Sequence, residues 1–120
     1  MLQEALDLGI DEPWRVAAGI GGGMGGCQDV CGAVSGAIIA IGYQTRKRPA
    51  DQKDATAAAR AKTREMYRAV ESQFGCVDCR TLVGVDFEEP GAQQAFRDAG
   101  GRDRVCKKVI EHVVRSLVPD

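Results

Sequence analysis

Hydrophobic positions recur with the period of an α-helix over residues 55–74. Five apolar side chains fall on one face of this segment: Ala55, Ala59, Met66, Val70 and Phe74. Charged side chains occupy most of the opposite face, and Gly75 follows as a typical C-terminal cap. The pattern predicts an amphipathic helix that ends at Phe74.

Two further stretches carry apolar patterns that predict helices. Residues 27–43 are apolar on nearly every side, which is typical of a helix buried in a soluble protein. Gly32, Gly36 and Ala40 recur there every four residues, and such small residues would let a neighbouring helix pack closely. Near the C-terminus, a helix that Asp103 would cap has one apolar stripe: Cys106, Val109, Ile110, Val113 and Leu117.

Shorter helices are predicted for residues 2–8 and 91–99, because glycines stop both segments. Asp11 is expected to cap another helix, with Pro13 in its first turn and Trp14 as a core or interface aromatic. Residues 46–54 form a polar linker that starts with a solvated turn at Arg46, Lys47 and Arg48.

The run Gly21-Gly22-Gly23-Met24-Gly25-Gly26 cannot form a stable helix interior, since each glycine costs about 1 kcal/mol relative to alanine. It permits tight turns and a close approach of the backbone to another group. The chain has no alternating pattern typical of strands. We therefore predict an all-α fold, a single domain over residues 1–120, built as a small bundle of about four main helices with a Gly-rich connection.

Charge and hydropathy narrow the classes of partner and the compartment. The chain carries 16 Lys and Arg against 17 Asp and Glu, so no basic field favours binding to nucleic acid. Its longest uncharged stretch, residues 30–45, is shorter than the ~20 residues of a membrane span, and the first residues lack a signal-peptide pattern. We expect a cytoplasmic protein without membrane contact, and the small-residue stripe would permit a homodimer.

Five cysteines carry the candidate chemistry: Cys27, Cys31, Cys76, Cys79 and Cys106. A reducing compartment disfavours structural disulfides, and an odd count leaves one thiol unpaired. On a helix, Cys27 and Cys31 would share one face. With Cys27 at the helix start instead, the helix dipole would lower the pKa of its thiol.

The C-x-x-C motif of Cys76 and Cys79 serves metal binding, a redox disulfide or haem attachment. Arg80 stands where c-type haem attachment requires His, so haem is disfavoured. Cys106 points into the bundle from the apolar stripe of the last helix. His112, the one histidine, is expected at the surface. The glycine run lacks the Lys of a P-loop, which argues against nucleotide binding.

Together, these residues resemble a family of redox-active proteins named for its motif, C_GCAxxG_C_C. The resemblance covers nearly the whole chain: Gly21–Gly25, Cys31-Gly32-Ala33-Val34-Ser35-Gly36-Ala37, Ile41-Gly42, Phe74-Gly75, Cys79-Arg80-Thr81-Leu82 and Cys106. It implies redox activity, with Cys31, Cys79 and Cys106 as the motif cysteines and Gly36 as the motif glycine.

Family members usually carry a further cysteine upstream, near an Asn-Cys-Ala segment. The sequence is expected either to be truncated or late-starting relative to that cysteine, or to use Cys27 in its place. A related domain in split-Soret cytochromes accompanies haem and an iron–sulfur centre, but the haem part has no counterpart in this sequence.

Three hypotheses follow. The first is a cysteine-ligated metal or iron–sulfur site that exchanges electrons with a partner protein of unknown identity. Its ligands would be Cys31, Cys79 and Cys106, with Cys27 or else Cys76 as the fourth, and its glycine contacts would be Gly23, Gly25, Gly32 and Gly36. The second is metal-free thiol–disulfide exchange, with Cys76 and Cys79 as the leading redox pair. The third is a non-catalytic module with structural zinc or a dimerisation role.

Overall fold

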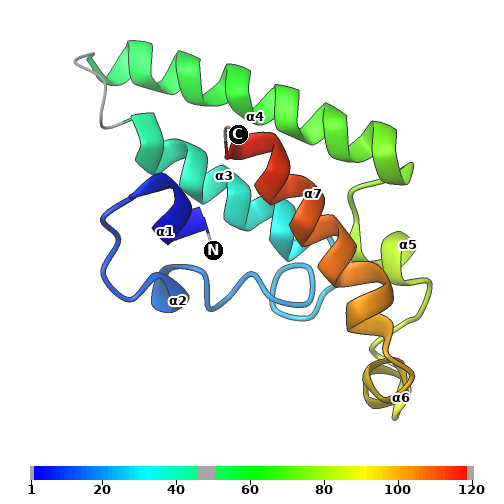
Figure 1. Cartoon of the computed structure of the whole chain (residues 1–120). Helices are drawn as coiled ribbons and strands as arrows, with labels where there is room; N and C mark the ends of the chain where they lie inside the picture. Colours follow the sequence, from blue (N-terminus) through cyan, green and yellow to red (C-terminus); the bar gives the residue numbers. More distant parts are fainter. Residues whose placement is uncertain (1, 46–50, 119–120) are drawn as a thin grey trace.

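The computed structural model describes residues 2–45 and 51–118, and this part of the chain is helical without a regular strand (Figure 1). The elements in chain order are α1 (Leu2–Leu6), α2 (Pro13–Val16), α3 (Gly32–Thr45), α4 (Gln52–Phe74), α5 (Cys79–Val83), α6 (Ala92–Asp98), the π-helix η1 (Arg102–Cys106) and α7 (Lys107–Leu117). The predicted all-α bundle is confirmed.

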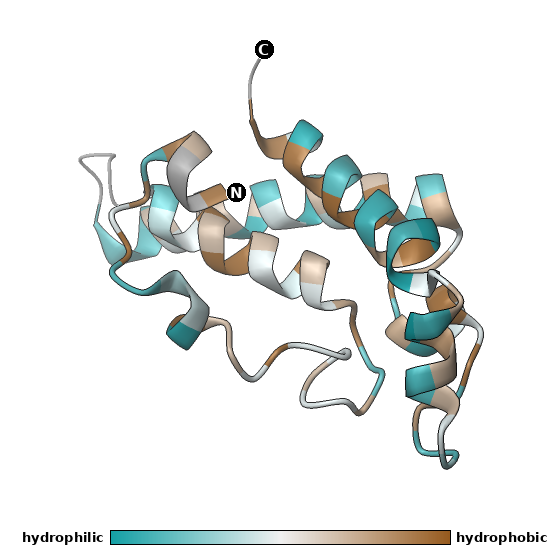
Figure 2. Ribbon diagram, turned by 60° about the horizontal axis from the view of Figure 1, so that its bottom comes forward, coloured by the Kyte–Doolittle hydropathy of each residue, from teal (hydrophilic) through white to brown (hydrophobic). Residues whose placement is uncertain are grey.

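Three long helices, α3, α4 and α7, pack against one another and form the core (Figure 1). Their buried side chains are Val34, Ala37, Ala40 and Ile41 from α3, Met66 and Val70 from α4, and Val109, Val113 and Leu117 from α7. Hydropathy colouring shows apolar and polar residues alternating around α7 (Figure 2). Burial of a large aliphatic side chain contributes about 1.5–3 kcal/mol, so this interior is what holds the helices together.

The helix α4 is the element that the sequence predicts best. It begins at Gln52, three residues before the predicted start, because the side chain of Asp51 accepts a hydrogen bond from the Asp54 N–H at 2.8 Å. It ends at Phe74, where Gly75 takes the left-handed conformation with φ 82°. The turn predicted at residues 46–48 lies outside the described residues.

The predicted helix over residues 27–43 starts too early, because α3 begins only at Gly32. Residues 28–31 instead form an irregular segment, in which Gln28 has a left-handed φ of 57° and Val30 forms an isolated antiparallel bridge with Asp78. Cys27 is therefore not part of a helix, so neither predicted placement of Cys27, on one helical face with Cys31 or at the helix start, is correct.

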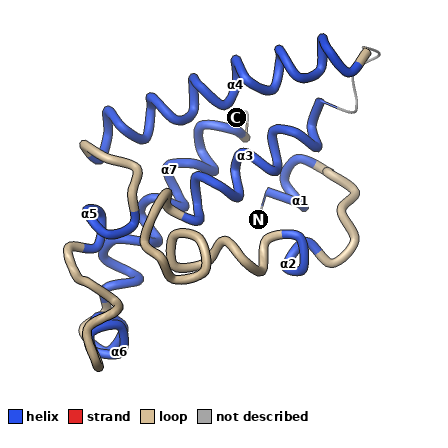
Figure 3. Tube along the Cα trace, turned by 180° about the vertical axis from the view of Figure 1, so that it is seen from behind, coloured by secondary structure: helices blue, strands red, loops and turns tan. Residues whose placement is uncertain are grey.

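Two residues of the small-residue stripe, Gly32 and Gly36, lie against the loop that precedes α3, and Figure 3 shows this loop leading into the helix. A Cβ added to Gly32 would lie 3.0 Å from the carbonyl oxygen of Ile20, and one added to Gly36 would lie 3.6 Å from Ile20 Cδ1. The prediction of a helix as packing partner for these two glycines is therefore wrong. The loop takes this place because its glycines let the backbone come close.

The helix α2 is a single turn, and its aromatic residue is not in the core. Its N-cap is Glu12, not Asp11, and the chain leaves the helix at Ala17. Trp14 is 62% exposed, with the guanidinium of Arg15 4.6 Å from the centre of its ring. Of the two predicted places for Trp14, core or interface, the core is wrong, because the single turn of α2 leaves the side chain exposed.

The C-terminal helix begins earlier than predicted, so Asp103 does not cap it. The π-helix η1 continues directly into α7, and Asp103 lies within η1. A π turn adds one residue relative to an α turn, and such turns are frequent at functional sites. No helix in the described ranges has the length and apolar character that crossing a bilayer requires.

Candidate functional site

The glycine-rich loop folds back on itself through backbone hydrogen bonds. The Gly25 N–H donates to Gly19 O at 2.8 Å, and the N–H groups of Gln28 and Asp29 donate to Gly22 O and Gly23 O at 2.9 Å. Gly22 and Gly23 have φ values of 62° and 66°, a conformation that L side chains rarely adopt. The predicted turn-forming role of the glycine run is confirmed.

A short antiparallel pairing joins this loop to the start of α5. The Cys31 N–H donates to Val77 O at 2.8 Å, and the Cys79 N–H donates to Asp29 O at 2.7 Å. These two bonds flank the bridge between Val30 and Asp78. Because side chains alternate between the two sides of a strand, Cys31 and Cys79 lie on the same side, as diagonal neighbours.

The third thiol comes from η1, which packs against α5. Cys106 is the last residue of η1, directly before α7. All three thiols line one cavity of about 170 Å³, whose walls are Gly22, Gly23, Cys31, Gly32, Ala33, Cys79, Phe87, Gln93, Phe96, Arg97, Arg102, Cys106 and Ile110. Three segments that are distant in the sequence therefore contribute one cysteine each to a single site.

The electrostatics of the cavity favour neutral thiols. Burial raises the pKa of Cys79, a hydrogen bond from Gln28 opposes this rise, and the thiols of Cys31 and Cys106 add to it. Burial also raises the pKa of Cys106, and the nearby Cys31 thiol raises it further. The guanidinium of Arg102 lowers it. Each thiolate thus makes the next ionisation harder, because like charges gather at low dielectric.

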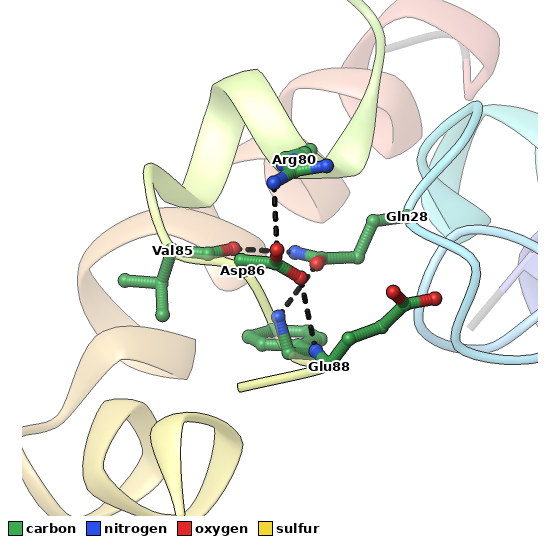
Figure 4. Close-up of polar contacts among 6 residues, drawn as sticks. Gln28, Arg80, Val85, Asp86 and Glu88 are labelled. Carbon is green, nitrogen blue, oxygen red and sulfur yellow. Dashed lines mark hydrogen bonds and ion pairs between the residues drawn. The ribbon is translucent and has the colours of Figure 1, made fainter. Parts of the chain in front are cut away.

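Gln28 holds the site together and has no counterpart among the residues predicted from sequence. Its side chain is 6% exposed; Nε2 donates to Val85 O and Oε1 accepts from the Phe87 N–H, both at 2.8 Å (Figure 4). The guanidinium of Arg80 pairs with Asp86 at 2.7 Å in the same loop (Figure 4). Gln28 therefore connects the glycine loop to residues 85–87 and to the Cys79 thiol.

The model of the family described as "Putative redox-active protein (C_GCAxxG_C_C)" matches residues 1–118 of the chain. The chain belongs to this family. Neither the curated proteins nor the solved structures contain a match to it. The three motif cysteines of the C_GCAxxG_C_C resemblance, Cys31, Cys79 and Cys106, are those that meet in the cavity.

The other two cysteines of this C_GCAxxG_C_C protein lie outside the cavity wall. Cys27 is exposed on the glycine loop, and Cys76 is half-buried with its thiol 3.9 Å from Phe74 O. Burial and the nearby carboxylate of Asp78 raise the pKa of Cys76. The C-x-x-C motif is therefore divided, with Cys79 inside the cavity and Cys76 outside it.

Only some of the four glycines predicted to contact a bound group line the thiol cavity. Gly23 and Gly32 line the thiol cavity, whereas Gly25 does not, and Gly36 lines a separate apolar cavity of about 360 Å³ between α3 and α7. His112 is remote from the thiols and packs its ring 5.5 Å from that of Phe74. Of the four predicted glycine contacts, only Gly23 in the glycine run and Gly32 at the start of α3 therefore remain candidates.

The cysteines of the cavity do not form a site for a single metal ion together with other described residues. Within residues 2–45 and 51–118, no group of three or more His, Cys, Asp or Glu side chains is arranged to hold one metal ion.

Proposed function

We propose that Cys31, Cys79 and Cys106 ligate an iron–sulfur cluster and that the protein transfers electrons. The observation that carries this proposal is the convergence of the three motif thiols on one cavity in a member of a redox-active family. Cysteine thiolates are the usual protein ligands of such clusters, and the bound cluster would supply one-electron redox chemistry.

The placement of the first two thiols supports a group bound to both. Cys31 and Cys79 lie on the same side of the bridge between Val30 and Asp78, and both line the cavity. A cluster with several iron atoms would offer a separate binding point to each thiolate.

The charge balance supports the same proposal. Burial, and to a lesser extent the neighbouring thiols, raises the pKa values of Cys79 and Cys106 and so disfavours thiolates in a metal-free cavity. Bound iron would replace the thiol protons and supply positive charge that stabilises the thiolates.

Residues around the three thiols would tune the properties of a bound cluster. Gly23 brings backbone close to Cys79, and the Gln28 amide donates to the same thiol. Phe87 and Phe96 pack ring to ring with centroids 5.6 Å apart, and both line the cavity, so they limit the access of water. Hydrogen bonds to the ligating sulfurs and exclusion of water are two main factors that set a reduction potential.

The test is anaerobic purification followed by iron, zinc and acid-labile sulfide analysis with a visible spectrum. Iron with sulfide, lost in each of Cys31→Ser, Cys79→Ser and Cys106→Ser, is the expected result. Cys27→Ser and Cys76→Ser are matched controls that should keep both. Protein free of iron and sulfide would overturn the proposal, and zinc alone would indicate a structural site.

Metal-free thiol–disulfide exchange is the second candidate. The absence of any single-ion group among the described residues favours it. Two thiols would pass two electrons and two protons to a disulfide substrate and form a disulfide themselves. Alkylation and mass spectrometry before and after mild oxidation would test this, because exchange removes two free thiols and leaves the rest.

A further inference from the structure

The mouth of the thiol cavity carries positive charge. Besides the three thiols, its polar side chains are Gln93, Arg97 and Arg102, all of which can donate hydrogen bonds. Among the described residues, no Asp or Glu lines it, although acidic residues slightly outnumber basic ones in the whole chain. Both arginines are exposed, so they stand at the mouth, whereas Cys79 is buried deeper.

The glycine loop adds backbone donors to the lining of the cavity. Gly22 and Gly23 are successive residues with positive φ, and both line the cavity. None of the loop hydrogen bonds between described backbone groups uses the N–H of either glycine. These two N–H groups are therefore available as hydrogen-bond donors beside the cavity.

We propose that the mouth of this cavity binds a small oxyanion, of the size of acetate or sulfate, between the two arginines and the glycine loop. In the metal-free protein, the cavity of about 170 Å³ has room for such an ion, since a water molecule occupies about 30 Å³ of liquid. Cys106 lies beside Arg102, so the ion is held next to a thiol.

This inference deepens the proposed function, because the anion is the class of redox substrate that would approach the three-thiol centre. Binding itself depends only on residues of the chain and needs no bound iron. It is therefore tested on reduced, metal-free protein, and a failure to find iron leaves this test intact.

The experiment compares two thiol reagents of similar size, iodoacetate, which carries a carboxylate, and neutral iodoacetamide. Mass spectrometry gives the alkylation rate of each cysteine with each reagent. The ratio of the two rates cancels the thiolate fraction, so it reports the attraction of an anion to the cavity. Cys27, exposed and outside the cavity, is the internal reference.

We expect the iodoacetate to iodoacetamide ratio to be higher at Cys106 than at Cys27. The double variant Arg97→Gln with Arg102→Gln should lower the Cys106 ratio by roughly fourfold. Each exposed arginine is expected to raise that ratio by about twofold, and the two effects multiply. Arg104→Gln removes an exposed arginine that does not line the cavity and should leave the ratio unchanged.

Competition at constant ionic strength identifies the anion. Slower alkylation of Cys106 by iodoacetate in sulfate than in chloride indicates a tetrahedral oxyanion, and an effect of acetate alone indicates a carboxylate. Equal ratios at Cys106 and Cys27, or an equal loss in Arg104→Gln, would overturn the proposal.

Discussion

Gly23 lies directly against Cys79: a Cβ built on the glycine would be 2.7 Å from Cys79 Cβ and 2.8 Å from Gln28 Cα. No other residue can occupy this place without moving the cysteine or the loop. Gly23 is thus needed for two reasons: it adopts a positive φ, and the absence of a side chain lets the glycine loop approach Cys79.

Gly23→Ala should therefore lower the free energy of unfolding by more than the left-handed backbone alone costs. A non-glycine residue in that conformation costs about 1–2 kcal/mol, and the clash adds to it. Gly26→Ala is the matched control, because Gly26 has φ 82° but nothing within 4 Å of an added Cβ. Denaturant unfolding of both variants checks this, and equal losses would show that the contact with Cys79 has no effect.

Gln28→Ala should destabilise the protein by about 1–3 kcal/mol, since it removes two partly buried hydrogen bonds, to Val85 O and from the Phe87 N–H. It should also raise the pKa of Cys79, because the hydrogen bond from Gln28 lowers it. Chemical denaturation and the pH dependence of Cys79 alkylation measure the two effects. Gln94→Ala, which removes an exposed bond to Asp98, should change the stability by only a few tenths of a kcal/mol.

Metal-free protein should lose stability as the pH rises above about 9. The folded-state pKa values of Cys79 and Cys106 lie above the ordinary 9.0, so their contribution is complete below that value and disappears as both thiols ionise. Unfolding measured from pH 7 to pH 10.5 tests this. The variant with Cys79→Ala and Cys106→Ala should show a flatter profile, and an unchanged slope would contradict the assignment.

Gly42→Ala should stabilise the protein by about 0.5–1 kcal/mol, because Gly42 lies in α3 with nothing within 4 Å of an added Cβ. Gly32→Ala at the other end of α3 should not, since its Cβ would lie 3.0 Å from Ile20 O. Thermal unfolding of the pair separates helix propensity from packing. A gain in both variants would mean that the loop at Ile20 gives way easily.

The sequence predicts those features that local patterns encode. The body of helix α4 and its C-terminal cap follow from a 3.6-residue period and from the properties of Gly75, whereas the N-terminal cap at Asp51 was not predicted. The motif resemblance likewise identifies Cys31, Cys79 and Cys106. Both features can be predicted because the residues of one helix, or of one specific motif, are sufficient to identify them.

The remaining features depend on contacts between distant segments. The bridge of Val30 with Asp78 delays the start of the predicted helix to Gly32, and no period in residues 27–31 signals it. Gln28 finds its partners at Val85 and Phe87, so its role is visible only after folding. The place of Cys27 outside the cavity follows from the same extended segment.

The cavity also has a consequence for the unfolded chain. Cys31 and Cys79 are 48 residues apart in the sequence, and Cys79 and Cys106 are 27 apart. Any group that ties the three together closes two long loops, and a cross-link over loops of this length reduces chain entropy by about 4 kcal/mol each in the simplest model. Loading such a group would then be a late step of folding, and its loss would loosen the contact between α5 and η1 before the core of α3, α4 and α7 opens.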